Sequence, residues 1–144
     1  MVTSLGPRTL RISRRAVLAF ALALVLASGA GLLLAAEPKP SVTLIVDYGD
    51  GASIHLKDLK WTAGMTAFDA LVAARAHRHG ITFTQKGTGR STLVTKIGDL
   101  ANEGSGKNWL YYVNDKPGEE SAAIHEIKAD DTVLWKFQQY DYNP

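Results

Sequence analysis

The sequence has 144 residues, with sixteen Lys or Arg residues, fourteen Asp or Glu residues and no cysteine. The absence of cysteine excludes disulfide bonds, thiolate chemistry and attachment of a lipid through an N-terminal cysteine. Four of the basic residues lie in the first fifteen, so the rest of the chain has a net charge near −2. A remainder without a basic excess gives no reason to expect nucleic-acid binding.

The first thirty-six residues are typical of a membrane-targeting segment. Before any acid appears, the chain has four arginines: Arg8, Arg11, Arg14 and Arg15. The run Ala16–Ala36 that follows is apolar or small throughout, and as a helix its roughly 21 residues would span about 31 Å, close to a bilayer's hydrocarbon thickness. Arginines before such a run place the following chain outside the cytoplasm. We therefore expect residues 1–36 to be a signal peptide or membrane anchor, and the rest to be periplasmic or extracellular.

Two details of this segment stay open. Cutting after Ala36 would put Leu34 at the unfavourable third position back, whereas cutting after Ala30 would leave an apolar overhang, so cleavage and retention as an anchor are both possible. Residues 13–18, Ser-Arg-Arg-Ala-Val-Leu, resemble a twin-arginine export signal. Val17 stands where such signals favour Phe, and an ordinary basic start is the alternative.

Residues 37–41 form a short connector whose two prolines stiffen the chain. Residues 42–144 are enough for one compact domain. This domain opens with a predicted β-hairpin. Residues 42–46 are rich in β-branched side chains, Asp50-Gly51 signals a turn, and residues 52–56 alternate between apolar and polar side chains.

One helix of about thirteen residues is predicted next. Thr66 with Asp69 three positions later is typical of a capped helix start, and Gly80 is typical of an end. One face carries apolar side chains at helical spacing: Phe68, Leu71 and Val72. The rest of the domain reads as extended segments, namely residues 81–84, 93–97, 109–113, 122–127 and 132–137. A hairpin, one helix and further strands predict an α+β domain with the helix packed across a sheet.

Two of these strands are unusually aromatic. Strict alternation places Trp109 and Tyr111 on one face of their strand and Tyr112 on the other, while Trp135 shares a face with Phe137. Aromatic side chains on both faces offer more apolar surface than one core needs, so the second face is predicted to line a ligand groove. The alternative is that Tyr112 merely packs on a neighbouring strand.

No residue pattern predicts catalysis or a metal site. The nucleophile motif Gly-x-Ser-x-Gly is absent, and residues 104–108 lack the spacing and the Ser or Thr of a phosphate loop. On a helix, His77 and His79 would lie about 200° apart and could not share a metal ion. His55 and His125 are isolated in the sequence. We therefore expect neither an enzyme nor a metal protein.

Three runs in this order resemble the transcobalamin-like C-terminal domain family, whose bacterial members are catalogued as a domain of unknown function. They are residues 64–71 (GMTAFDAL), 109–114 (WLYYVN) and 131–135 (DTVLW). The resemblance covers about residues 42–140 and implies a β-grasp-like α+β domain that binds a ligand without transforming it. In the vitamin B12 carriers and intrinsic factor, this domain closes over cobalamin held against a separate α-helical barrel, which the present chain lacks.

The sequence thus predicts an exported, non-catalytic binding module for a small planar ligand, such as a corrinoid (cobalamin-like), with a helical partner domain completing the site. The predicted contact residues are Trp109, Tyr111, Tyr112 and Trp135. The alternative is a cell-surface module that binds a protein or polysaccharide and no small molecule. A β-grasp-like fold hosts many functions, so the fold cannot choose between them.

Overall fold

The computed structural model describes residues 37–140. The predicted targeting segment, 1–36, lies outside these described residues, as do the last four residues of the chain. From Pro38 onward the described residues belong to one compact unit. Within 37–140, the only α-helix is far too short to cross a membrane.

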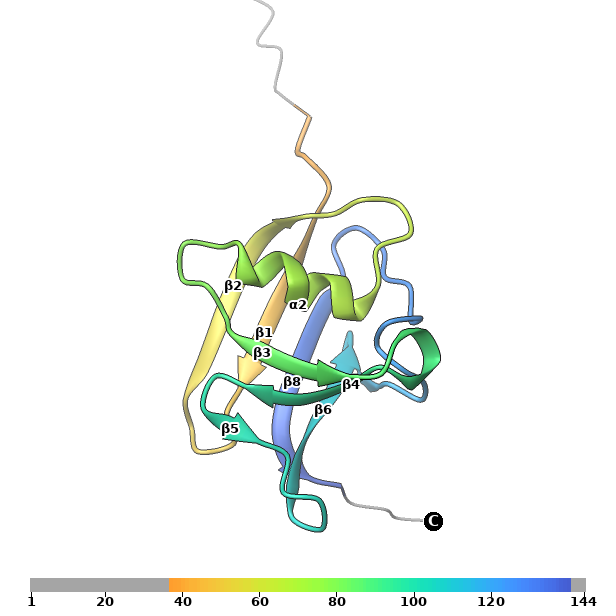
Figure 1. Cartoon of the computed structure of the whole chain (residues 1–144). Helices are drawn as coiled ribbons and strands as arrows, with labels where there is room; N and C mark the ends of the chain where they lie inside the picture. Colours follow the sequence, from red (N-terminus) through yellow and green to blue (C-terminus); the bar gives the residue numbers. More distant parts are fainter. Residues whose placement is uncertain (1–36, 141–144) are drawn as a thin grey trace, which may run out of the picture. The chain divides into compact units, whose positions relative to one another are not determined.

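The described residues form one α-helix, one 3₁₀ turn and eight strands, shown in Figure 1. In chain order they are β1 (Ser41–Asp47), β2 (Ser53–Lys60), α2 (Ala67–Arg75), β3 (Phe83–Lys86), η1 (Gly89–Ser91), β4 (Leu93–Ile97), β5 (Leu100–Ala101), β6 (Lys107–Val113), β7 (Lys116–Pro117) and β8 (Thr132–Gln139).

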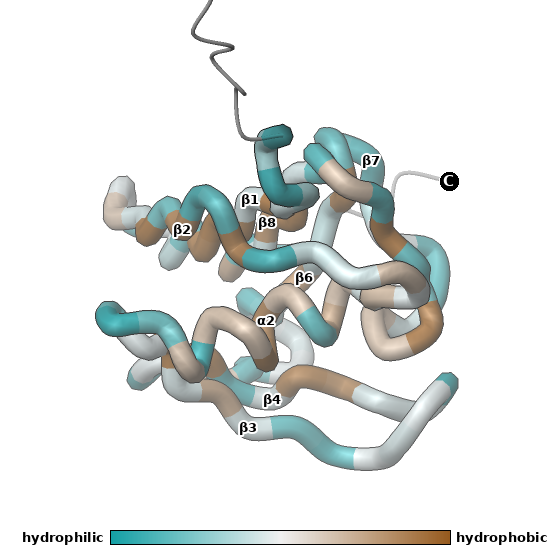
Figure 2. The backbone as a smooth tube through the Cα atoms, turned by 90° about the horizontal axis from the view of Figure 1, so that it is seen from above, coloured by the Kyte–Doolittle hydropathy of each residue, from teal (hydrophilic) through white to brown (hydrophobic). Residues whose placement is uncertain are grey.

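The strands form two sheets. Five of them pair in the order β2-β1-β8-β6-β7, and β3-β4-β5 form a smaller sheet. The first and last long strands, β1 and β8, are parallel neighbours, while the other pairs are antiparallel, so the larger sheet is mixed. Helix α2 and the smaller sheet lie on the same face of the larger sheet (Figures 1 and 2). The predicted β-grasp-like α+β fold with one packed helix is confirmed.

The opening hairpin forms as the alternation predicts. Leu44 of β1 lies opposite Leu56 of β2, and both are buried. Further along β2 the register shifts at a bulge, where Asp58 has a positive φ of 59°. Because the bulge adds one residue, Leu59 also turns inward and is buried.

The helix begins as predicted but ends earlier. The Thr66 side chain accepts a hydrogen bond from the Asp69 backbone N–H (3.2 Å), and the Asp69 carboxylate accepts one from the Thr66 N–H (2.9 Å), which completes a capping box. The predicted continuation to Gly80 is wrong, because α2 stops at Arg75. The Ile81 N–H donates to the Ala74 carbonyl (3.3 Å), so the chain folds back after only nine helical residues.

A second prediction is also wrong. Residues 122–127 do not form an extended strand, since they turn beside the sheet. The backbone N–H groups of Ile124 and His125 both donate to the Ser121 carbonyl, which tightens the turn. Among the described residues, this segment forms one isolated β-bridge, between Glu126 and Thr66.

The core lies between the larger sheet and the helix with the smaller sheet. Small residues on α2 let the helix approach closely, since Ala67, Ala70 and Ala74 are all fully buried. The largest fully buried side chains are Leu44, Leu71, Ile97, Val42, Val46 and Val133. The tube coloured by hydropathy in Figure 2 shows the separate layers that these side chains hold together.

Candidate functional site

Four aromatic side chains form a row on the inner face of the larger sheet. Trp109 of β6 lies opposite Phe137 of β8, with ring centroids 5.2 Å apart, and Tyr111 lies opposite Trp135 at 5.5 Å. Trp109 and Trp135 are each only 3% exposed, and Tyr111 is 8% exposed. Alternation along both strands therefore delivers the predicted aromatic face, and it faces inward.

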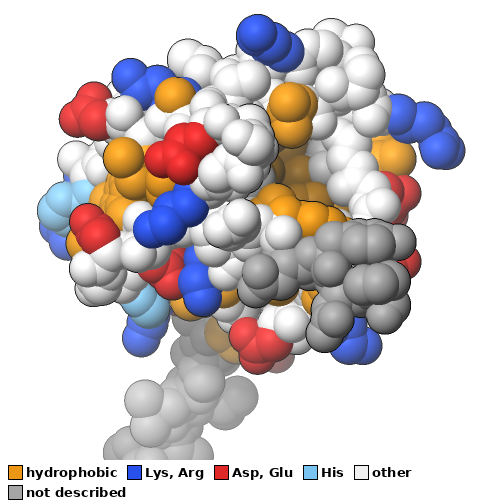
Figure 3. Space-filling model, turned by 90° about the horizontal axis from the view of Figure 1, so that it is seen from below, with side chains coloured by type: hydrophobic (Ala, Val, Ile, Leu, Met, Phe, Trp, Pro, Cys, Tyr) orange, Lys and Arg blue, Asp and Glu red, His pale blue; other side chains and the backbone are white. Residues whose placement is uncertain are grey.

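A cavity of about 210 Å³ adjoins this row at the edge of β6. Its walls come from α2, β4, β6, β8 and the segment that follows β7. We call it the β6 pocket, and its lining residues are Phe68, Thr92, Leu93, Val94, Trp109, Leu110, Tyr111, Tyr112, Pro117, Gly118, Glu120, Ser121, Ala122, Trp135 and Tyr140. Figure 3, which views the molecule from below, shows a hollow with hydrophobic side chains at its base.

The polar atoms of two inner aromatics are used inside the protein. The Trp109 indole N–H donates to the Leu100 carbonyl (2.8 Å), and the Tyr111 hydroxyl donates to the Glu120 carbonyl (2.8 Å). The Trp135 indole nitrogen differs, because it is buried without a hydrogen-bond partner among residues 37–140. Two rings are thus fixed in orientation by hydrogen bonds, while Trp135 is held by packing alone.

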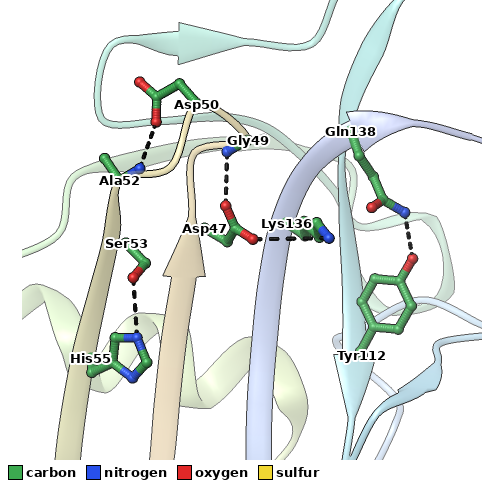
Figure 4. A network of polar contacts seen from close by, with 9 residues as sticks. All are labelled: Asp47, Gly49, Asp50, Ala52, Ser53, His55, Tyr112, Lys136 and Gln138. Atoms are coloured by element: carbon green, nitrogen blue, oxygen red, sulfur yellow. Dashed lines mark hydrogen bonds and ion pairs between the residues drawn. The ribbon is translucent and has the colours of Figure 1, made fainter.

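Tyr112 lies on the opposite face of β6, which packs against neither α2 nor the smaller sheet. Its hydroxyl accepts a hydrogen bond from the Gln138 side-chain amide of β8 (2.6 Å), as Figure 4 shows. Beside this pair, Lys136 of β8 lies 3.9 Å from the carboxylate of Asp47 on β1. Tyr112 is half-buried, so its ring is available at the rim of the β6 pocket.

The segment after β7 closes the pocket over Tyr111. The Gly118 N–H donates to the Tyr111 carbonyl (2.9 Å), and Gly118 lies so close to the Tyr111 ring that a Cβ would overlap it. Ser121 connects the same segment to the residue just before β4, because its hydroxyl lies 3.0 Å from the Thr92 carbonyl. The wall of the pocket is therefore anchored at two points.

The environment keeps the Tyr111 phenol neutral. Burial raises its pKa above the ordinary value of 10.0, and the negative charge of Glu120 raises it further. His125, which looked isolated in the sequence, lies beside it, with Nδ1 3.3 Å from the Tyr111 oxygen. A neutral hydroxyl can keep donating to the Glu120 carbonyl throughout the physiological pH range.

All four residues predicted from the sequence line the β6 pocket: Trp109, Tyr111, Tyr112 and Trp135. Sequence reasoning missed the opposite wall, including Phe68 and Leu93. Leu93 is 55% exposed, which is unusual for a large apolar side chain beside a cavity. Nothing in the sequence indicated that Gly118 packs on a tyrosine ring.

The predicted positions of His77 and His79 on a helix are wrong. His77 and His79 do not lie on opposite sides of a helix, because α2 ends before them, and their rings are 5.6 Å apart. In the part of the chain that the structure describes, no three His, Asp or Glu side chains are grouped as a metal site.

A model of the family described as "Domain of unknown function (DUF4430)" matches residues 64–139, more than half of the chain. The chain belongs to this family. The match runs from just before α2 to the end of β8, so the DUF4430 domain includes every lining residue of the β6 pocket except Tyr140. The predicted resemblance thus holds at the level of the domain of unknown function, and the closer likeness to vitamin B12 carriers stays a prediction.

The DUF4430 domain is also similar to a solved structure from Ruminococcus gnavus ATCC 29149, described as a "putative metal binding protein". The TM-score is 0.56 at 11% sequence identity, over 70% of this chain and 98% of the other. At that identity the likeness shows the fold alone. No curated protein matches the chain.

Proposed function

We propose that the chain is an exported, non-catalytic binding module whose ligand inserts a flat apolar group into the β6 pocket. One observation carries this proposal: a cavity of about 210 Å³ is lined by all four predicted contact residues, Trp109, Tyr111, Tyr112 and Trp135. Its lining is mainly apolar, with a few polar groups such as Thr92, Glu120 and Ser121, the composition typical of ligand sites.

The size of the cavity limits the ligand. Pockets that enclose a drug-sized molecule usually measure about 300–1,000 Å³. The β6 pocket is smaller and has room for one ring or one large side chain. A corrinoid, the planar ligand that the family resemblance suggests, would therefore be held by an edge or a peripheral group, with its remainder covered by a helical partner domain.

The "putative metal binding protein" description of the Ruminococcus gnavus structure is compatible with such a ligand. A corrinoid brings its own cobalt ion, so it needs no cluster of metal-binding side chains in the protein.

A protein or glycan at the cell surface is the second candidate. A specific observation favours it: the edge of β6 beside the pocket is covered by β7 only at Tyr112 and Val113. The half-exposed Leu93 on the opposite wall adds apolar surface outside the cavity. Catalysis is not part of either proposal.

A thermal-shift titration of the full-length chain in mild detergent tests the small-ligand proposal. The probes are cobalamin, cobinamide, haem and the dye ANS. A ligand at one hundred times its Kd stabilises by about 2.7 kcal/mol, which raises the midpoint of a domain this size by more than about 10 °C. We expect Tyr112→Ala to abolish the rise and Val72→Ala, a surface change outside the pocket, to preserve it.

Three outcomes would contradict parts of this proposal. No shift with any probe would exclude a small planar ligand. A shift of equal size in Tyr112→Ala would place the ligand elsewhere. Turnover of a substrate, abolished by one polar substitution, would show an enzyme.

A further inference from the structure

The outer edge of β6 is incompletely paired. Along one edge, β6 pairs with β8 over its whole length. Along its other edge, called the outer edge here, β7 pairs only with Tyr112 and Val113. Two bonds show which groups point outward: the Trp109 N–H donates to Asn102 Oδ1 (2.8 Å), and the Tyr111 carbonyl accepts from the Gly118 N–H (2.9 Å). In an antiparallel pair, alternate residues direct both backbone groups away from the partner strand. The N–H and carbonyl groups of Trp109 and Tyr111 therefore all point to the outer edge of β6.

Between these two bonds lie one acceptor and one donor, the carbonyl of Trp109 and the N–H of Tyr111. Neither makes a hydrogen bond to any residue in the described range, 37–140. Both belong to residues that line the β6 pocket, as does Leu110 between them. Backbone groups beside an apolar cavity need partners, since leaving them unpaired costs free energy.

The pattern of free groups selects the direction of an added strand. An antiparallel guest residue exchanges two bonds with the N–H and carbonyl of one host residue, and here Trp109 has only its carbonyl free and Tyr111 only its N–H. A parallel guest residue opposite Leu110 instead donates to the carbonyl before it and accepts from the N–H after it. An antiparallel strand could reach both free groups only through two different residues, and each of these would leave its second backbone group facing a host group that is already bonded. A parallel strand satisfies both with the N–H and carbonyl of one residue, so the parallel direction is favoured.

The surroundings describe the side chains of such a guest. A cavity of about 210 Å³ has room for one large apolar side chain. Glu120 is the charged residue among the pocket's lining, and it lies at the Tyr111 end, where its carbonyl accepts the Tyr111 hydroxyl. A parallel guest runs from Trp109 toward Tyr111, so its residues after the apolar side chain head toward the end of the pocket that Glu120 lines, where the Glu120 carboxylate lies 4.0 Å from His125 Nδ1.

We propose that β6 binds an extended peptide segment of a partner protein as an added parallel strand. One large apolar side chain of the segment fills the β6 pocket, and a basic residue that follows it pairs with Glu120. This is strand addition, in which backbone bonds provide affinity and a side-chain pocket provides specificity. The inference rests on the proposed function only in using the same pocket, and it names a peptide as the ligand.

The first experiment selects a displayed library of random heptapeptides against the full-length chain in mild detergent. We expect enriched sequences in which Lys or Arg follows a large apolar residue within two positions. Glu120→Gln should weaken binding of such a peptide about two- to five-fold. Glu119→Gln, next in sequence but outside the pocket lining, should have no effect.

The second experiment probes the backbone with the best selected peptide. N-methylation at one peptide position should reduce affinity about tenfold or more, while methylation at the two adjacent positions is tolerated, because their N–H groups point away from β6. In amide hydrogen exchange, the Tyr111 N–H should become protected on peptide addition. The Leu110 N–H, which faces β8, should not change.

The outcomes separate this inference from the proposed function. Peptide binding with Tyr111 unprotected overturns strand addition and leaves the pocket as a binding site. No enriched peptide, with ANS still bound and lost in Tyr112→Ala, overturns the peptide inference alone. Failure of both peptides and planar probes overturns both. Protection of Tyr111 that rises with protein concentration, without peptide, would assign the edge to a second copy of the chain and overturn the partner proposed here.

Discussion

Gly118 and the Tyr111 ring are in direct contact, and this contact shapes one wall of the β6 pocket. A Cβ at position 118 would overlap the ring, whereas the backbone there has an ordinary negative φ. Glycine is therefore needed for space and not for a special backbone conformation. The Tyr111 hydroxyl, bonded to the Glu120 carbonyl, fixes the ring so that it cannot easily move aside.

Gly118→Ala is expected to lower the free energy of unfolding by about 1–3 kcal/mol, the usual cost of overpacking. Urea unfolding followed by tryptophan fluorescence measures it. Gly106→Ala is the matched control, because its Cβ would meet the exposed carboxylate of Glu103, which accepts from the Lys107 N–H (2.7 Å), rather than a fixed, buried ring. Equal losses in the two variants would contradict the role of the Tyr111 contact.

The raised pKa of Tyr111 predicts a loss of stability at high pH. A group whose pKa is higher in the folded state adds stability that is complete below its unfolded pKa, near 10, and lost as pH rises through the folded value. We expect the free energy of unfolding to fall above about pH 10. Tyr111→Phe should flatten this fall and cost about 0.5–1.5 kcal/mol at pH 7, through the lost hydrogen bond to Glu120.

Tyr48 must be included in the same measurement. Its pKa is also raised, first by burial and then by the charge of Asp99, so Tyr48→Phe should remove a separate part of the alkaline loss. An alkaline profile that is unchanged in the Tyr111→Phe, Tyr48→Phe double variant would show that other groups cause it.

At the scale of elements, the β6–β7 hairpin has the two-residue turn that suits antiparallel strands. Asn114 and Asp115 have positive φ values of 49° and 64°, as both central residues of a type I′ turn require. The Asn114 side chain also bridges to the start of β8: its amide donates to Asp131 Oδ1 (2.7 Å), and its oxygen accepts from the Thr132 N–H (2.9 Å). This turn therefore links two hairpin strands to a third strand.

Asn114→Ala is expected to destabilise by about 2–4 kcal/mol, since it combines a strained positive φ with two lost hydrogen bonds. Asp115→Ala is the control, because it introduces the same backbone strain with no hydrogen bond from its side chain in any described contact. The difference between their free energies of unfolding, from chemical denaturation, measures the bridge to β8. No difference would mean that the bridge contributes nothing.

The sequence predicted the type of most helices and strands better than the residues at which they end. The capping residues Thr66 and Asp69 located the helix start, because a cap is a local interaction between neighbouring residues. The helix end depends on Ile81 folding back to Ala74, which local propensity does not encode. Likewise, residues 122–127 resemble a strand, but within 37–140 their only ladder pairing is the bridge between Glu126 and Thr66, and the segment turns.

For the whole molecule, the compact unit that begins at Pro38 predicts an independent domain. Deleting residues 1–36 should leave the thermal midpoint of the domain within about 4 °C of that of the full-length chain, a change below about 1 kcal/mol. Calorimetry of both proteins in the same detergent measures this. A fall well beyond that range would show that the deleted segment stabilises the domain.

The sequence by itself determined the α+β class, the helix start and which side chains share a face on each aromatic strand. These follow from local periodicity, because alternation fixes which side chains share a face wherever the strand lies. It also marked four of the residues that line the β6 pocket.

Only the tertiary structure decided that a pocket exists and where it opens. Its walls combine β4, β6 and the segment after β7, and its free backbone groups exist because β7 is too short to cover β6. A cavity depends on which distant segments fail to meet, and no pattern of neighbouring residues records that. For the same reason the free edge at Trp109 and Tyr111, and with it the direction of a guest strand, emerges only from the assembled sheet.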